Sequence, residues 1–102
     1  IIRDTCSLYQ VALYSKKQLL AEQVELALYG DRVELSGSHK ETFCFADVSN
    51  LTILGKNKLN LYTDNEILQL KGDKRFNALK YLNFYHRYKN LQTGDAYEFL
   101  GL

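Results

Sequence analysis

Residues 67–92 read ILQLKGDKRFNALKYLNFYHRYKNLQ, and the spacing of their apolar residues changes part-way from two to about 3.6. Ile67 to Leu70 has the pattern of a last short strand, and Gly72 and Asp73 follow it as turn residues. The rest of the stretch contains no Gly or Pro, and its apolar side chains share one arc at about 100° per residue. We therefore predict an amphipathic helix over about 73–92, with Asp73 as its N-cap.

The apolar arc of the predicted helix spans about 200°, which is wider than one core requires. Its members are Ala78, Leu79, Tyr81, Leu82, Phe84, Tyr85 and Tyr88. Tyrosine is favoured where one end of the side chain is buried and the other end is wet. The residues expected to contact protein are Tyr81, Tyr85 and Tyr88, with Phe99 and Leu100 of an apolar tail at 95–102. The tail itself, a partner domain of the same chain or a second copy could cover this arc.

Before residue 67 the sequence alternates between apolar and polar residues in short runs separated by polar turns. These strand-like runs lie at 8–14, 19–29, 32–35, 42–45, 51–54 and 59–62, within a strand region of about 6–71. Turn residues recur about every eight to twelve residues, which is the spacing of an antiparallel barrel or sandwich. The sequence therefore predicts a mainly β, α+β domain over 1–94, with seven antiparallel strands in a barrel or sandwich capped by one C-terminal helix.

Composition limits the possible functions. The chain has 102 residues, of which 46% are hydrophobic and 25% charged, and its net charge is +1. This is the composition of one folded globular domain, and the nearly balanced charge argues against a nucleic-acid partner. The sequence starts Ile1-Ile2-Arg3 and contains no Met, so we expect it to be a piece of a longer protein.

The residues that most often carry catalysis or metal binding are sparse. Cys6 and Cys44 have no His near them in the sequence, whereas a cysteine nucleophile needs a base beside it. His39 lies in a polar turn and His86 on the polar arc of the helix, without the spacing of a metal site. We expect the cysteines to be small apolar fillers and the histidines to be solvated. The sequence thus predicts no catalytic residue, no metal site and no cofactor, although the fold decides whether a His lies beside a Cys.

Basic residues are concentrated in the second half of the chain. Residues 55–90 carry eight Lys or Arg against three Asp or Glu, whereas the remainder carries five against nine. Such an asymmetry can mark an anionic partner. The candidates for contact with a phosphate or an anionic lipid are Lys56, Lys58, Lys74 and Arg75, with Lys71 beside them. A helix N-terminus would add to their attraction for anions; the alternative is that they are ordinary surface charges.

The order of elements resembles that of the pleckstrin-homology-like (PH-like) barrel, in its bacterial PH-like and GRAM-like form. The resemblance rests on FADVSNL at 45–51, KLNLY at 58–62, the strand at 64–70 and the helix. It implies two bent sheets closed at one end by the last helix. Lipid-binding PH domains usually carry a basic cluster between their first two strands, where this chain has only Lys16 and Lys17. This departure argues against specific phosphoinositide recognition and leaves weak attraction to an anionic leaflet.

A second resemblance concerns GKNKLN at 55–60, KGDKRFNALKY at 71–81 and EFLGL at 98–102. These stretches look like the C-terminal extension of some Firmicute phospholipid/glycerol acyltransferases. Together, the two resemblances imply a non-catalytic, cytoplasmic accessory module of a larger membrane-associated lipid enzyme. The module would dock on the catalytic domain of the same chain, form a homodimer, or hold the enzyme at an anionic inner membrane face. The alternative is a free-standing ligand-binding barrel or a small enzyme.

The catalytic motif of those acyltransferases is a His followed by an Asp five positions later. Here His39 is followed at that offset by Cys44, and His86 by Leu91. The motif is therefore absent, and the resemblance implies no acyltransferase activity for this chain.

Overall fold

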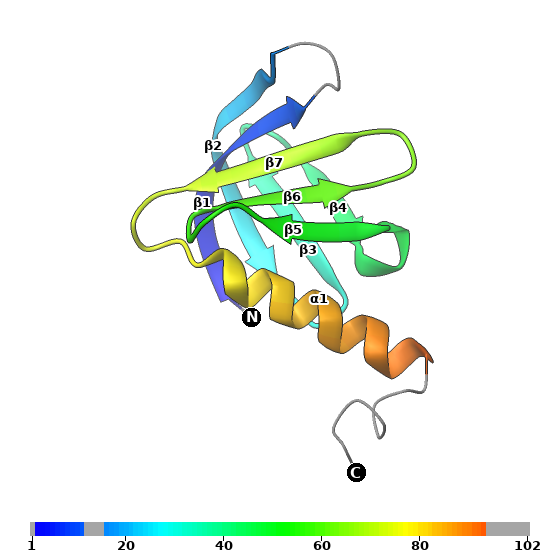
Figure 1. Ribbon diagram of the computed structural model, residues 1–102. Coiled ribbons are helices and arrows are strands. Elements are labelled where there is room, and N and C mark those ends of the chain that lie inside the picture. The colour runs from blue at the N-terminus through cyan, green and yellow to red at the C-terminus, as the bar shows by residue number, and fades with distance from the viewer. Residues whose placement is uncertain (1, 12–15, 94–102) are drawn as a thin grey trace.

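The computed structural model describes residues 2–11 and 16–93 (Figure 1). Its strands are β1 (Ile2–Val11), β2 (Gln18–Leu28), β3 (Arg32–Gly37), β4 (Glu41–Cys44), β5 (Asn50–Ile53), β6 (Lys58–Tyr62) and β7 (Ile67–Gly72). A 3₁₀ helix, Phe45–Asp47, lies between β4 and β5, and the α-helix α1 spans Ala78–Thr93. The predicted apolar tail at 95–102 lies outside the described residues.

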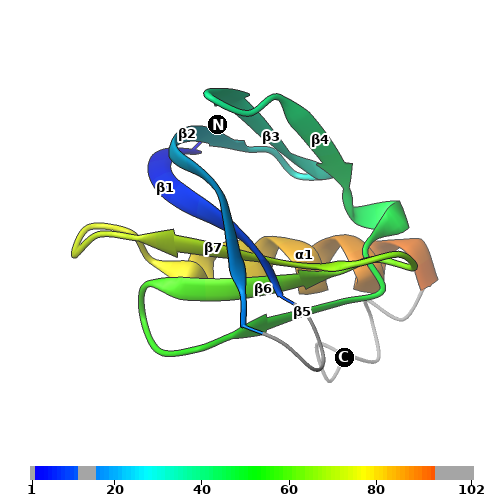
Figure 2. The same cartoon turned by 90° about the horizontal axis from the view of Figure 1, so that it is seen from above.

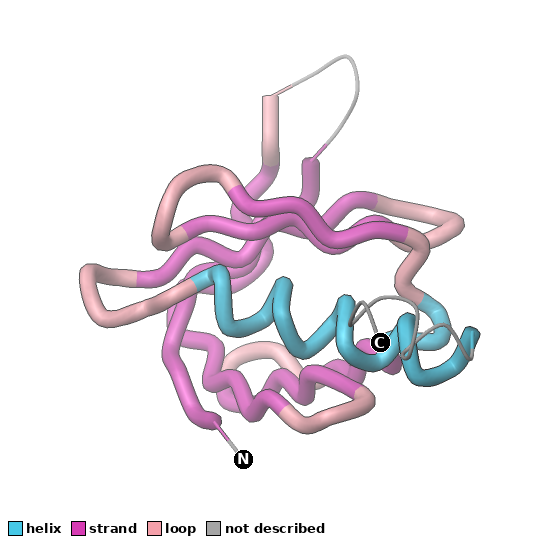
Figure 3. The backbone as a smooth tube through the Cα atoms, turned by 60° about the horizontal axis from the view of Figure 1, so that its bottom comes forward, coloured by secondary structure: helices cyan, strands magenta, loops and turns pink. Residues whose placement is uncertain are grey.

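All strand pairs are antiparallel, and the seven strands form one sheet in the order β4-β3-β2-β1-β7-β6-β5. The sheet curls into a half-barrel, so that its two end strands, β4 and β5, lie on opposite sides of the interior (Figure 2). The helix α1 lies along the side left open by the curl, against β5 and the 3₁₀ helix (Figure 3). This arrangement confirms the predicted mainly β fold with seven antiparallel strands and one C-terminal helix.

The sheet bends at β1. This strand pairs with β2 from Ile2 onward, and from Cys6 onward it also pairs with β7. Its register with β2 shifts on both sides of Leu8, and such bulges bend a strand and increase its twist. We expected the strand region to begin at about residue 6. It begins four residues earlier because Ile2 pairs with Leu28 and packs against the core.

One apolar core fills the space between the concave side of the sheet and the buried face of α1. Its largest fully buried side chains are Tyr81, Phe45, Phe76, Leu8, Leu26, Leu28, Leu59, Leu61, Leu68 and Leu70. Burying a side chain of this size contributes roughly 1.5–3 kcal/mol. Ala78, Tyr81 and Tyr85 of the predicted apolar arc face this core, but Leu79 is 47% exposed. Leu82, Phe84 and Tyr88 are partly buried against the same core, so the core covers only part of the apolar arc, which is wider than one core requires.

The helix begins at Ala78, which is later than predicted. Phe76 is almost completely buried and packs so closely on Gly72 that a Cβ at Gly72 would collide with its ring. Asp73 caps a turn, since its Oδ1 accepts a hydrogen bond from the Arg75 N–H (2.8 Å). Asn77 is the true N-cap, because its Oδ1 accepts from the N–H of the second helical residue (3.1 Å). Burial of Phe76 thus overrides the helical pattern read from Lys74 onward.

Phe45 also departs from the predicted secondary structure. We placed it in the strand 42–45, but β4 ends at Cys44 and Phe45 starts the 3₁₀ helix. The Phe45 N–H donates to the Asp31 carbonyl (2.9 Å), and its ring is fully buried against Tyr85, edge to face. The predicted alternation of faces holds, since Phe43 is buried and Cys44 exposed.

Two amide side chains are buried on the outer face of the sheet. Asn60 of β6 and Gln69 of β7 are direct cross-strand neighbours and only 9% and 6% exposed. Gln69 donates from Nε2 to Asn60 Oδ1 (3.1 Å) and accepts from Lys17 Nζ (2.9 Å). Lys17 also lies over the Tyr9 ring, 4.6 Å from its centroid. Both amides are therefore hydrogen-bonded, as buried polar groups need to be.

Candidate functional site

Two backbone–backbone hydrogen bonds and one side-chain–backbone hydrogen bond join the β5–β6 loop to the two ends of the segment between β7 and α1. The Gly72 N–H donates to the Asn57 carbonyl (2.8 Å), and the Ala78 N–H donates to the Lys56 carbonyl (2.8 Å). The Asn57 side-chain amide donates to the Gly72 carbonyl (3.3 Å). The two segments are thus held side by side at one end of the half-barrel, where the yellow and green loops meet in Figure 1. Lys56 is thereby attached to the start of α1, and its loop lies against the two ends of the segment that carries Lys74 and Arg75.

The strand register adds a second pair of cations to this end of the molecule. Lys58 of β6 lies directly opposite Lys71 of β7. Directly opposed residues of antiparallel strands project from the same face of the sheet, and like charges in that position destabilise it. An anion bound between Lys58 and Lys71 would relieve this repulsion. We call the set Lys56, Lys58, Lys71, Lys74 and Arg75 the basic corner; it contains all four candidates for anion contact.

The cations of the basic corner have no acidic partner among the residues that the structure describes. The ion pairs among the described residues involve other cations: Arg32 with Asp31 and Glu34, His39 with Glu41, and Lys80 with Asp4. Asp73 is the acidic residue within the segment itself, and its Oδ1 accepts from a backbone N–H. Lys71 and Asp73 also line an open hollow of about 280 Å³ together with Glu22. Positive charge therefore predominates at the basic corner, with carboxylates on one side of it.

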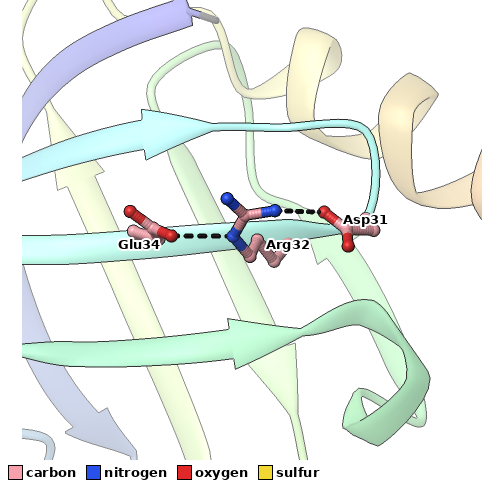
Figure 4. Close-up of polar contacts among 3 residues, drawn as sticks. All are labelled: Asp31, Arg32 and Glu34. Carbon is pink, nitrogen blue, oxygen red and sulfur yellow. Dashed lines mark hydrogen bonds and ion pairs between the residues drawn. The ribbon is translucent and has the colours of Figure 1, made fainter.

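Arg32 at the β2–β3 turn is the opposite case. Its Nε contacts Glu34 Oε2 and its Nη1 contacts Asp31 Oδ1, both at 2.7 Å (Figure 4). Its guanidinium also lies over the Tyr29 ring, 3.8 Å from the centroid. Hydrogen bonds to Glu34 and then to Asp31 raise the pKa of Arg32. These contacts satisfy the charge of Arg32 within the chain.

The N-terminus of α1 contributes less to anion binding than we expected. Its first three N–H groups, those of Ala78, Leu79 and Lys80, already donate to acceptors of the chain. The acceptors are the Lys56 carbonyl, the Asn77 side chain and the Asn77 carbonyl. A backbone anion cradle needs N–H groups that point at the ligand. Contact with an anion would therefore fall to the side chains of the basic corner.

The tyrosines expected to contact protein are mostly engaged inside the chain. Tyr81 is fully buried, and its hydroxyl donates to Asp4 Oδ2 (2.6 Å). Tyr85 is 4% exposed, and its hydroxyl donates to the Val48 carbonyl (2.8 Å). Burial raises the pKa of both phenols, and for Tyr81 the hydrogen bond to Asp4 adds to the effect. Tyr88 is half-buried against Phe45 and stays a predicted protein contact.

The other two predicted protein contacts, Phe99 and Leu100, lie outside the described residues.

Of the cysteines and histidines, only Cys6 lies at the basic corner, where it lines the hollow beside Lys71. Cys6 is buried, and desolvation, followed by the charge of Asp4, raises its pKa to about 12. Cys44 is exposed on β4. His39 Nε2 lies 3.0 Å from Glu41 Oε1, and His86 is exposed on α1. Within 2–11 and 16–93, no group of three or more His, Cys, Asp or Glu side chains is placed to hold a metal ion.

Comparison with known proteins leaves the family open. No protein-family model matches the chain, and no curated protein matches it. In the described part of the chain, no helix combines the length and apolarity that crossing a membrane requires. The half-barrel is compatible with a PH-like fold. The functional argument therefore depends on the geometry of the basic corner.

Proposed function

We propose that this chain is a non-catalytic PH-like module that attaches weakly to an anionic membrane surface through the basic corner. The observation that carries the proposal is that the fold gathers five cations at one end, none of which has an acidic partner among the described residues. A Lys or Arg close to an anionic leaflet contributes roughly 1 kcal/mol of attraction. Five such residues, reduced by the nearby carboxylates, correspond to a dissociation constant of about millimolar.

The PH-like part of the proposal is supported by the seven-stranded antiparallel half-barrel and its C-terminal helix. The position of the basic corner differs from the usual lipid site of that family, which lies between the first two strands. In this chain Lys17 of the β1–β2 connection is held by Gln69 and Tyr9. A corner built from the β5–β6 loop and the β7–α1 segment favours general attraction to negative charge over recognition of one headgroup.

Weak attachment suits a module that works beside another membrane contact, because stable anchoring takes two signals. We therefore also propose that the module serves a larger membrane-associated lipid enzyme, as its resemblance to acyltransferase extensions implies. Docking on a catalytic domain or a second copy through Tyr88 is compatible with this role. A ligand-binding barrel is less favoured, because apolar side chains fill the interior of the half-barrel.

Vesicle sedimentation tests the proposal. Binding to vesicles of phosphatidylserine and phosphatidylcholine should exceed binding to phosphatidylcholine alone, and should fall as salt is added. The triple variant Lys56→Glu, Lys74→Glu, Arg75→Glu should lose this binding at least tenfold, since it replaces attraction by repulsion. All three side chains are exposed, so the fold should be kept, which circular dichroism checks.

The matched control reverses three exposed cations elsewhere: Lys16→Glu, Lys40→Glu and Arg87→Glu. It changes the net charge equally, so it should keep most of the binding if the basic corner is the contact. An equal loss in the control would overturn the proposal, because net charge alone would then explain binding. Tighter binding to a duplex DNA of similar charge density than to the vesicles would also overturn it.

A further inference from the structure

We infer that the basic corner inserts two leucines, Leu54 and Leu79, into the boundary between headgroups and acyl chains of an anionic bilayer. This inference rests on the proposed membrane attachment and adds an apolar component to it. Both side chains are 47% exposed, although the half-barrel has a well-filled core. Single exposed leucines are ordinary on protein surfaces. These two need an explanation because of where they lie.

Leu54 lies beside the opposed lysines. It extends β5 by one residue, and its N–H donates to the Lys58 carbonyl (2.9 Å). Side chains alternate along a strand, and opposed residues share a face. Leu54 therefore continues the row formed by Lys71 and Lys58 on the outer face of the sheet. An exposed apolar side chain thus stands at the end of a row of cations.

Leu79 lies on the other border of the basic corner. It follows Ala78, whose N–H donates to the Lys56 carbonyl (2.8 Å). Its own N–H is fixed by the Asn77 cap. The first turn of α1 is thus attached to the β5–β6 loop, and Leu79 directly follows the residue that binds the Lys56 carbonyl. Leu54 thus precedes the β5–β6 loop and Leu79 follows the β7–α1 segment, so the two exposed leucines flank the two segments that carry most of the basic corner.

This combination fits the chemistry of a bilayer interface. Peripheral membrane contacts place apolar side chains at the acyl boundary while Lys and Arg meet anionic headgroups. Salt screens the electrostatic part but not the apolar part. A nucleic-acid duplex offers negative charge without an acyl layer, so the leucines favour a lipid surface. We therefore expect part of the binding to anionic vesicles to persist at high salt.

A single introduced tryptophan reports insertion directly, because the chain contains no Trp. With anionic vesicles, the emission of Leu54→Trp should shift to the blue and be quenched by brominated lipids. Leu20→Trp is the matched control, since Leu20 is 40% exposed on β2, away from the basic corner. Its emission should not change. Equal blue shifts at both positions would overturn the inference, because insertion would then not be specific to the corner.

Binding of the protein to anionic vesicles at high salt gives an independent test of insertion. The pair Leu54→Ser and Leu79→Ser should weaken it by roughly three- to tenfold, because it removes apolar area from the interface. The pair Leu19→Ser and Leu20→Ser, at similar exposure, should leave it within about twofold. Salt-sensitive binding with unshifted Leu54→Trp emission would overturn insertion and leave the proposed attachment standing. No binding to anionic vesicles at any salt would overturn the attachment and the insertion together.

Discussion

The β2–β3 turn and the basic corner both carry cations at or near strand ends, but the contacts of these cations within the chain differ. Arg32 has two carboxylates at 2.7 Å and a ring beneath its guanidinium. Lys58 faces Lys71, and neither has an acidic partner among the described residues. The first arrangement stabilises a turn from within, whereas the second leaves charge available to a partner outside the chain. The number of cations in a segment therefore says less about binding than their internal contacts do.

The largest loss of stability is expected from removing the side chain that anchors the basic corner to the core. Phe76 is 1% exposed and packs on Tyr81, with ring centroids 5.1 Å apart. Phe76→Ala should lower the free energy of unfolding by about 3–5 kcal/mol, because a large cavity would remain. Urea unfolding measures this loss. Leu79→Ala, at an exposed position three residues later, should change the free energy by less than about 0.5 kcal/mol. Similar losses from both changes would show that Phe76 is not the anchor.

The stability of the protein should depend on pH through Cys6, which pairs with Gly72 at the base of the basic corner. The folded pKa of Cys6 is raised to about 12 from 9.0, first by burial and then by the charge of Asp4. Below pH 9 the thiol is protonated in both the folded and the unfolded chain, so its titration does not change the free energy of unfolding. Above pH 9 the unfolded chain releases a proton that the folded chain retains, and stability falls as pH rises. One pH unit above 9 should remove about 1 kcal/mol of unfolding free energy.

Urea midpoints from pH 8 to 10.5 measure this slope, and Cys6→Ala should remove most of it below pH 10. Tyr81 also has a raised pKa and acts in the same direction at higher pH. A variant that keeps the full slope would show that Cys6 is not its source.

The smallest expected effects are changes in the free energy of unfolding when one cation is neutralised at the basic corner or at the β2–β3 turn. Lys58→Gln should raise the free energy of unfolding by about 0.3 kcal/mol, because it ends the opposition to Lys71. Arg32→Gln should lower it, because Asp31 and Glu34 would lose their cation. Thermal melts of both variants measure the two signs. A loss of stability in Lys58→Gln would mean that Lys58 has a favourable contact, contrary to the account of the basic corner.

The sequence predicted the class of fold well because its signals are local. Alternation along each strand, turn residues between strands and the switch of period after residue 70 depend on neighbours in the chain. The errors arise where long-range packing decides. Burial of Phe76 on Gly72 delays the helix to Ala78, and burial of Phe45 turns the end of a predicted strand into a 3₁₀ helix.

The candidate site shows the same division. Its basic residues could be found by composition, but their mutual position could not. The opposition of Lys58 and Lys71 depends on the β6–β7 register, and the position of Lys56 depends on its carbonyl accepting from Ala78. The width of the apolar arc indicated that part of it would lie outside the core, but a helical wheel does not say that Leu79 is the residue left exposed.

The buried pair of amides on the outer face has a consequence for how the chain folds. If β7 slipped by one residue, Gln69 would enter the apolar interior without Asn60, while Leu68 and Leu70 would turn to solvent. An unpaired buried amide is costly, so this misregistered sheet is discouraged during folding. The same register sets Lys58 opposite Lys71. The amide pair therefore disfavours the slipped register. The register that it favours is the one that places the two lysines side by side.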